Sequence, residues 1–414
     1  MTSRASTLSL YLGRASVALV LVFALVVAAL ASAGCSGCKK TAQASAGPLT
    51  AGARIDIPAE RAAYVTDNGS DAVSVIDRDG DAVVNVPLDL DPDVHEAPHH
   101  LALDSSTKNV FVALAFPPET ASKKGAHANH GSAASVGRLV RLDLGTLAVQ
   151  QLTDVDENPG DVVLTHDRKK VLVTHFDMKR AMDVAAQGGA SPATMFARLT
   201  VFDASTMKLL AARAVCVAPH GVVTSRDDKT AFVACYGSDE LAIIDLTNEA
   251  LSISRHPLGL TPGVPGVPRY GPYSALLSPD ESRVIVANLE GQDLRIFDRR
   301  EKRFLADKTV PLAAKAFMPA FVDARTVMVP LQSPDGLALV DVESSKVVTR
   351  TSFPKSDCTL PHAVRVARDG RAYLVCEGDH RAPGTILEID PKTLAAKRRW
   401  SVGVYPDGIS FGDE

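Results

Sequence analysis

The sequence predicts an all-β fold, a seven-bladed β-propeller whose blades are four-stranded antiparallel sheets. A short β-rich run ending in aspartate recurs seven times, and another strand-like run precedes each copy. The shortest intervals between successive aspartates are 42 residues (Asp203 to Asp245) and 43 residues (Asp298 to Asp341). Four short strands repeated at that period are typical of a propeller, and no segment shows a convincing helical apolar stripe.

Each repeat contains the same elements in the same order. A proline-led run such as "PHGVVTS" (219–225) comes first, and a turn separates it from a second run such as "AFVAC" (231–235). A third run such as "LAIID" (241–245) ends in the aspartate, and a looser fourth run follows. Because these aspartates recur so regularly, we expect them to accept hydrogen bonds from backbone amides of the next turn rather than to be catalytic. The seven aspartates are Asp77, Asp143, Asp203, Asp245, Asp298, Asp341 and Asp390.

The two ends of the repeat region complement each other. The first copy begins at "AYVTD" (63–67) without a proline-led run, and the chain closes with the proline-led "YPDGISFGDE" (405–414). Pairing of this last strand into the first blade would close the ring and remove two exposed sheet edges. We therefore expect the C-terminal strand to be important for stability.

The repeat resembles that of a known family. "YVTDNGSDAVSVID" (64–77) and "FVACYGSDELAIID" (232–245) are similar to the YVTN repeat of YncE-like bacterial seven-bladed propellers. The resemblance covers roughly residues 58–414 and implies an exported propeller. Some family members have been linked to DNA binding or to surface-layer function. Here 44 basic residues stand against 48 acidic ones, so charge gives no reason to expect a nucleic-acid partner.

The N-terminal region has the features of a targeting segment. Residues 1–34 contain two arginines and then an uncharged apolar run that ends in small residues before Cys35. This ending resembles a lipobox, which implies lipidation of Cys35 and anchoring to the outer membrane, on its periplasmic or cell-surface side. An ordinary cleaved signal or a retained anchor helix remains open. Residues 35–57 are predicted to be a flexible linker, and residues 58–414 the propeller.

The four cysteines of the repeat region predict two disulfides. Cys216 precedes a proline-led strand and Cys235 ends the next, and Cys358 and Cys376 hold the same places in another repeat. These positions are neighbours at one end of an antiparallel pair, which suits a disulfide in an exported protein. Metal binding by the four thiolates is the alternative.

The residue after each proline is the main candidate for function. His99, His220, His362 and Asp407 occupy this equivalent position in four repeats, and we expect them at the mouth of the central channel. Imidazole and carboxylate groups that converge can hold Zn, Cu or Fe. The alternative is a structural role in the turn into the strand, or ligand binding without a metal. The adjacent His100 is expected to point away by strand alternation, and further histidines are expected in loops on the same face: His127, His130, His175 and His380.

These features predict a binding or scaffold module rather than an enzyme. Three long inserts (116–137, 177–196 and 256–272) are expected on the histidine-bearing face, where a protein or small-molecule ligand would bind. The sequence contains none of the common motifs of hydrolases, phosphate loops or zinc peptidases. The alternative function is a metal-binding redox protein or enzyme with its site at the channel mouth. A lactonase, an activity also known on seven-bladed propellers, is a third reading that no motif supports.

Overall fold

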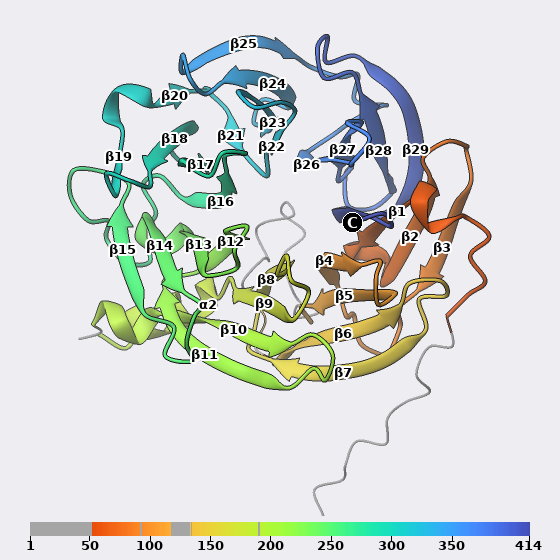
Figure 1. The fold of residues 1–414 in the computed structure, drawn as a ribbon, viewed down its shortest axis with the longest axis horizontal. Coiled ribbons are helices and arrows are strands. Elements are labelled where there is room, and N and C mark those ends of the chain that lie inside the picture. Colours follow the sequence, from red (N-terminus) through yellow and green to blue (C-terminus); the bar gives the residue numbers. More distant parts are fainter. Residues whose placement is uncertain (1–51, 92, 117–132, 134, 189–190) are drawn as a thin grey trace, which may run out of the picture. The chain divides into compact units, whose positions relative to one another are not determined.

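A computed structural model describes residues 52–414 except 92, 117–132, 134 and 189–190. In the described part, the strands form seven antiparallel sheets arranged around a centre (Figure 1). This arrangement is the predicted seven-bladed propeller. Among the residues described, no helix has the length and apolar character needed to cross a membrane.

The innermost strand of each blade lies at the ring centre and the outermost at its rim (Figure 1). The first blade contains β30 (Pro406–Phe411), β1 (Ala62–Asp67), β2 (Ala72–Asp77) and β3 (Val83–Pro87). The second blade contains β4 (Pro98–Asp104), β5 (Asn109–Leu114), β6 (Gly137–Asp143) and β7 (Val149–Val155). The third blade contains β8 (Pro159–Leu164), β9 (Lys170–His175), β10 (Ala197–Asp203) and β11 (Leu209–Cys216). The fourth contains β12 (Pro219–Thr224), β13 (Thr230–Cys235), β14 (Glu240–Asp245) and β15 (Ile253–Pro257).

The remaining blades include the least regular sheets. The fifth blade contains β16 (Pro272–Leu277), β17 (Arg283–Asn288), β18 (Asp293–Asp298), β19 (Arg303–Phe304) and β20 (Val310–Pro311). In the sixth, two short pieces, β21 (Lys315–Ala316) and β22 (Ala320–Phe321), replace one innermost strand and precede β23 (Thr326–Gln332), β24 (Gly336–Asp341) and β25 (Lys346–Thr351). The seventh contains β26 (Pro361–Val366), β27 (Ala372–Cys376), β28 (Pro383–Ile389) and β29 (Ala396–Val404).

Short helices lie between some strands. The α-helix α2 (Met178–Ala186) and the 3₁₀ helix η4 (Pro192–Met195) lie in the insert between β9 and β10. The other 3₁₀ helices are η1 (Ala59–Arg61), η2 (Asn68–Ser70), η5 (Tyr236–Ser238) and η6 (Ala306–Lys308).

The C-terminal strand closes the ring as predicted. β30 pairs antiparallel with β1, with Val65 opposite Ile409 and Ala63 opposite Phe411. Both Ile409 and Phe411 are buried in the apolar core between the first and seventh blades. The closing strand is therefore part of the core and not a terminal extension.

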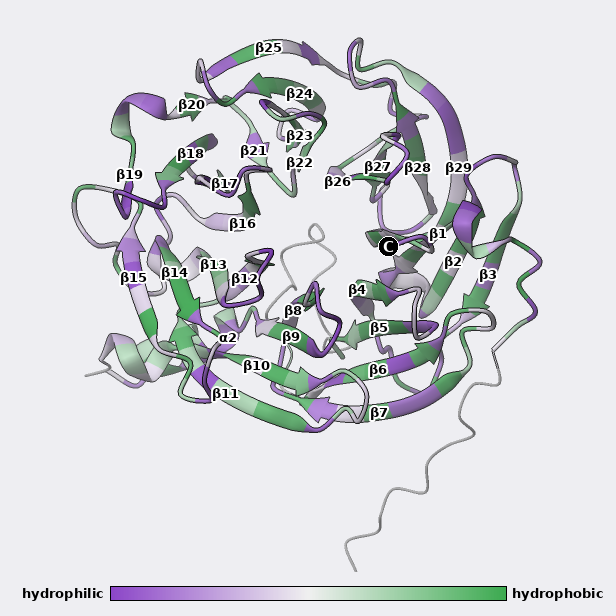
Figure 2. Ribbon diagram, in the orientation of Figure 1, coloured by the Kyte–Doolittle hydropathy of each residue, from purple (hydrophilic) through white to green (hydrophobic). Residues whose placement is uncertain are grey.

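Apolar side chains on the strands pack between neighbouring blades, and hydrophobic residues are concentrated along many strands in Figure 2. The repeat-ending aspartates cap the following turns, as predicted. Asp143 accepts hydrogen bonds from the amide of Gly145 at 3.0 Å, and Asp203 from the amide of Thr206 at 2.7 Å. Asp77, Asp245, Asp298, Asp341 and Asp390 accept equivalent amide hydrogen bonds.

Both predicted disulfides are present. Cys216 is bonded to Cys235, with their Cα atoms 5.9 Å apart, and Cys358 is bonded to Cys376, with a Cα separation of 5.2 Å. Because Cys216 is the last residue of β11, the first disulfide ties the rim strand of the third blade to the second strand of the fourth. It therefore connects two blades.

The described end of the predicted linker packs on the propeller. Ala53, Ile55 and Ile57 lie against the core between the first two blades, and the amide of Ala53 donates to the carbonyl of Thr146 at 2.8 Å. The predicted targeting segment, Cys35 and most of the 116–137 insert lie outside the described residues.

Candidate functional site

The backbone enters most innermost strands through the same strained turn. In six blades a residue in the left-handed conformation comes directly before the proline, with φ between 49° and 59°. These residues are Ala97, Asn158, Ala218, Gly271, Leu360 and Tyr405. Five of the six are not glycine, and such a conformation costs on the order of 1–3 kcal/mol at each position. Non-glycine residues with positive φ also occur in other turns of the blades, so this conformation is a shared feature of the fold, and here it sets the position of the residues that follow the prolines.

The four predicted ligands lie in those positions, at the entry ends of the innermost strands. His99 is on β4, His220 on β12, His362 on β26 and Asp407 on β30. All four are buried, with 1% of His99 exposed and none of the other three. The prediction that they lie at an open channel mouth is therefore wrong: they lie inside the protein.

His100 does not point away from these residues as strand alternation predicts. The register between β4 and β5 shifts between Pro98 and Leu101, where three steps along β4 oppose two along β5. This β-bulge breaks the alternation and brings the His100 ring to the same side as the His99 ring, with centroids 4.2 Å apart. The His100 ring also lies 5.5 Å from that of His220 and 6.2 Å from that of His362.

Each of the four imidazole rings has an acceptor at Nδ1. His100 Nδ1 lies 2.8 Å from Asp161 Oδ1, and His362 Nδ1 lies 2.5 Å from Glu377 Oε1. His99 Nδ1 contacts Asp407 Oδ2, and His220 Nδ1 lies 3.1 Å from the carbonyl oxygen of Tyr273. An acceptor at Nδ1 favours the tautomer with its proton there, which places the lone pair on Nε2.

Asp407, on the first blade, lies between histidines of the second and seventh blades. Its Oδ1 is 3.1 Å from His362 Nε2 and 3.9 Å from His100 Nε2, and its Oδ2 contacts His99. Two triads place their ligand atoms within 4.8 Å of one another: His99, His100 and His220, and His100, His362 and Asp407. Ligand atoms of a tetrahedral zinc site lie about 3.4 Å apart, so the separations in either triad need to shorten by at most about 1.4 Å to hold an ion.

Burial and ion pairing shift the pKa values of the cluster's side chains in different directions. Burial would raise the pKa of Asp407, but the charges that His99 and His362 can carry hold it well below the usual range. Burial lowers the pKa of His99 to about 4, against the attraction of Asp407. Burial would also lower the pKa of His362, but the carboxylates of Asp407 and Glu377 raise it. The metal-free cluster thus contains an ionised Asp407, a neutral His99 and a His362 that is readily protonated.

Aromatic rings enclose the cluster. The Tyr273 ring stacks on the His220 ring with a centroid separation of 3.8 Å, and Phe176 meets the same histidine edge-on at 5.2 Å. Phe317 lies 5.4 Å from the His362 ring. These side chains come from three further blades or their loops, and they explain the burial of the histidines.

Two threonines support the bulged strands. In blade three, the amide of Asp161 donates to Thr174 Oγ1 at 2.8 Å, and the Thr174 hydroxyl donates to the carbonyl of His220 in the next blade at 2.6 Å. Thr66 similarly accepts from the amide of Gly408 at 2.9 Å and donates to the carbonyl of His99. The threonine of the "YVTD" repeat thus links a bulge in one blade to the site residue of the next.

Other predicted histidines have separate roles. His175 is buried at the end of β9 in the third blade, with Nδ1 2.9 Å from the carbonyl oxygen of Arg198. His380 Nε2 lies 2.8 Å from Glu377 Oε2, so Glu377 connects His380 to His362. His127 and His130 lie outside the described residues.

Sequence reasoning did not identify Asp161 or Glu377 as site residues. Asp161 is the residue of its repeat equivalent to His100, two places after the proline, so the repeat alignment carried a signal for it. Glu377 directly follows Cys376, and its position beside His362 depends on the β26–β27 pairing.

Comparison with known proteins shows the fold alone. Neither profiles of protein families nor curated protein sequences match the chain. Among solved structures, the periplasmic gluconolactonase PpgL of Pseudomonas aeruginosa has a TM-score of 0.59 at 18% identity, over 84% of this chain and 98% of that one. A Bacteroides uniformis protein described as a 6-phosphogluconolactonase has a TM-score of 0.60 at 13% identity, over 85% of this chain and 99% of that one.

Hydrazine synthase of Kuenenia stuttgartiensis has a TM-score of 0.55 at 15% identity, over 77% of this chain and 90% of that one. The chain is thus a propeller whose structural neighbours include enzymes. This agrees at the level of the fold with the resemblance to YVTN-repeat propellers.

Proposed function

We propose that this protein is an exported metal-binding module that holds one divalent transition-metal ion at the centre of its propeller. His100, His362 and Asp407 form the centre, and His99 and His220 are adjacent donors. A mixed imidazole and carboxylate set suits Zn²⁺, Cu²⁺ or Fe²⁺. The observation that carries the proposal is the convergence of the Asp407 carboxylate with two histidines whose Nδ1 atoms are each held by a further carboxylate.

The second set of contacts distinguishes this cluster from a simple buried ion pair. Metal-binding histidines commonly donate their other ring N–H to a carboxylate or to a backbone carbonyl, which fixes the ring orientation. Asp161 and Glu377 supply that carboxylate for His100 and His362, and Tyr273 supplies a carbonyl for His220. The four imidazoles come from three blades, so the geometry of the site depends on the closed propeller.

Export is the other part of the proposal. The apolar segment before Cys35 supports it, as do two disulfides, which are typical of exported proteins. Lipidation of Cys35 would tether the propeller to the outer membrane. A protein or small-molecule partner at the face that carries the 177–196 and 256–272 inserts remains part of the same prediction.

A metal titration tests the proposal. The full chain, purified in detergent with its disulfides intact, is titrated with Zn²⁺, Cu²⁺ and Fe²⁺ against a chromophoric chelator. We expect one ion per chain, with at least about tenfold weaker binding in Asp407→Asn and His362→Gln. His166→Gln is the matched control, because His166 is half exposed and pairs with Asp228 away from the cluster. Undetectable binding by the parent, or equal affinity in all variants, would refute the proposal.

The same titrations separate a binding role from a redox role. A redox centre would take copper or iron and show a reversible potential in voltammetry, whereas preference for Zn²⁺ indicates binding without electron transfer.

A further inference from the structure

A cavity lies along the channel, next to the buried cluster. It has a volume of about 610 Å³, within the range of small-molecule pockets, and innermost strands from six of the seven blades line it together with Met318 and Pro319. His100 and Asp407 lie at one end of it. Residues of the turns that follow the innermost strands lie at the other end, including Thr165, Arg168 and Arg368.

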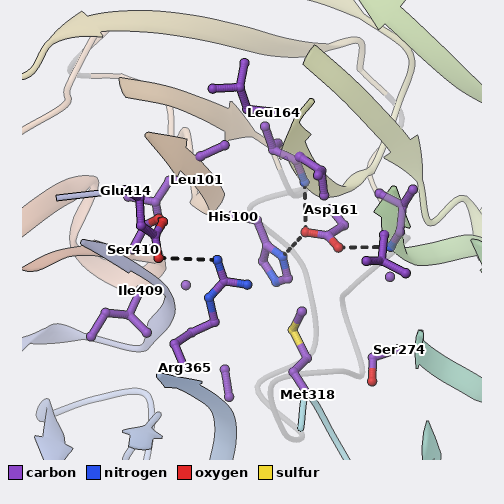
Figure 3. Close-up of a pocket in the computed structure, with 18 of the residues that line it drawn as sticks. His100, Leu101, Asp161, Leu164, Ser274, Met318, Arg365, Ile409, Ser410 and Glu414 are labelled. Atoms are coloured by element: carbon purple, nitrogen blue, oxygen red, sulfur yellow. Dashed lines mark hydrogen bonds and ion pairs between the residues drawn. The ribbon is translucent and has the colours of Figure 1, made fainter. Parts of the chain in front are cut away.

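The walls of this cavity are aliphatic. Figure 3 shows side chains from several blades facing the same space, with the ring of His100 and the chain of Arg365 projecting into it. The aliphatic and thioether side chains that line it include Leu101, Leu164, Val223, Leu276, Met318 and Ile409. Such walls favour a ligand with an apolar body.

The outer end of the cavity contains arginine N–H donors that make no hydrogen bond to the described residues. Arg168 is paired with Asp104 at 3.1 Å, and His166 with Asp228 at 2.9 Å. By contrast, the nearest acid to Arg365 is Glu414, with 3.9 Å between guanidinium nitrogen and carboxylate oxygen, which is too long for a hydrogen bond.

Arg368 is exposed and has no hydrogen bond or ion pair with the part of the chain that the structure describes. Arg365 lies on β26, and Arg368 lies three positions later, in the turn that follows this strand. Two guanidinium groups with unused N–H donors therefore border the same cavity. Guanidinium groups bind carboxylates through paired N–H donors.

The inner end of the cavity already contains two carboxylates, those of Asp161 and Asp407, and does not favour an anionic ligand group. Asp161 accepts hydrogen bonds from His100 and from the amides of Val162 and Val222. Asp407 is a buried carboxylate at the same end. These acids would repel an anionic head group placed there, so the charge distribution fixes its orientation.

We infer that the channel cavity binds a small aliphatic carboxylate, with its head group on Arg365 and Arg368 and its hydrocarbon chain between the aliphatic walls. The inference does not depend on the metal site, because its contacts lie at the opposite end of the cavity.

Calorimetric titration of the metal-free full chain with octanoate tests this inference. We expect saturable binding of octanoate and much weaker binding of acetate, which lacks the chain, and of octylamine, which has the wrong charge. Arg365→Gln combined with Arg368→Gln should weaken octanoate binding by about tenfold or more. Arg381→Gln, an exposed arginine in the β27–β28 loop of the same blade, should have no effect.

A second variant tests the walls. Leu276→Gln places an amide in the channel and should also weaken octanoate binding, while the melting temperatures of the arginine variants should match that of the parent. Absence of octanoate binding, or equal binding by the parent and the double arginine variant, would overturn the inference. Equal binding of acetate and octanoate would do the same, because the aliphatic walls would then contribute nothing.

Discussion

Deletion of residues 406–414 should prevent stable folding. This segment includes β30, and its removal takes Ile409 and Phe411 out of the core, each worth about 1.5–3 kcal/mol when fully buried. The lost backbone pairing with β1 adds net hydrogen-bond contributions of about 0.5–1.5 kcal/mol each. The two side chains alone account for about 3–6 kcal/mol, and with the backbone hydrogen bonds the loss approaches the whole stability of a typical domain, about 5–15 kcal/mol.

Denaturant unfolding followed by circular dichroism measures this loss. A rearranged chain, in which residues 406–414 directly precede Pro58, is the control. The amide of Gly412 donates to the carbonyl of Ala62 at 3.0 Å, so the end of the closing strand already lies beside the start of β1. The rearranged chain should unfold cooperatively with nearly the stability of an otherwise unaltered chain that begins at Pro58, since both lack the contacts of Ala53, Ile55 and Ile57. A truncated chain whose unfolding free energy falls within about 1 kcal/mol of the parent would refute the reasoning.

Three further predictions concern stability and positioning. Replacing Cys358 and Cys376 by serine opens a loop of 18 residues and should lower the free energy of unfolding by about 3 kcal/mol. An unchanged denaturant midpoint would contradict this prediction. Burial raises the pKa of Asp67 to about 7, so the folded chain keeps a proton that the unfolded chain releases near pH 4. The stability from this group is therefore complete below about pH 4 and is lost as the pH rises to 7, by up to ~1.4 kcal/mol per pH unit. Asp67→Asn should remove that slope, and a variant with the parent's pH profile would disprove the assignment. Asp161→Asn should weaken metal binding about 10- to 100-fold without changing the number of ions bound, because Asp161 orients His100 and is not itself a ligand.

The repeat pattern was enough to predict the fold. The seven copies of the aspartate-ending run predicted the number of blades, and their spacing predicted four strands in each. The incomplete repeats at the two ends predicted the ring closure between β30 and β1. The cysteine positions indicated both disulfides, but the β26–β27 pairing explains only the one between Cys358 and Cys376. Cys216 lies on the rim strand of the third blade, so its bond to Cys235 joins two blades and not two strands of one pair. These features depend on local periodicity, which a single sequence records.

The geometry of the site could be predicted only in part. The position after each proline singled out His99, His220, His362 and Asp407, which the structure brings together. It did not reveal their burial, to which aromatic side chains of other blades contribute. His100 was assigned to the wrong side because alternation assumes a regular strand, and the left-handed residue and bulge at the blade entry break it. Neither irregularity has a distinctive residue type at these positions, since Ala, Asn, Leu and Tyr all adopt the left-handed turn.

Anomalous diffraction from crystals of the zinc-loaded protein tests the central claim most directly. Data collected on both sides of the zinc absorption edge locate the ion independently of any assumption about its ligands. The account predicts one strong peak within bonding distance, about 2.0–2.2 Å, of Asp407 Oδ1 and of the Nε2 atoms of His100 and His362. A propeller that crystallises with zinc bound only at surface residues, or with no anomalous peak at the centre, would contradict it.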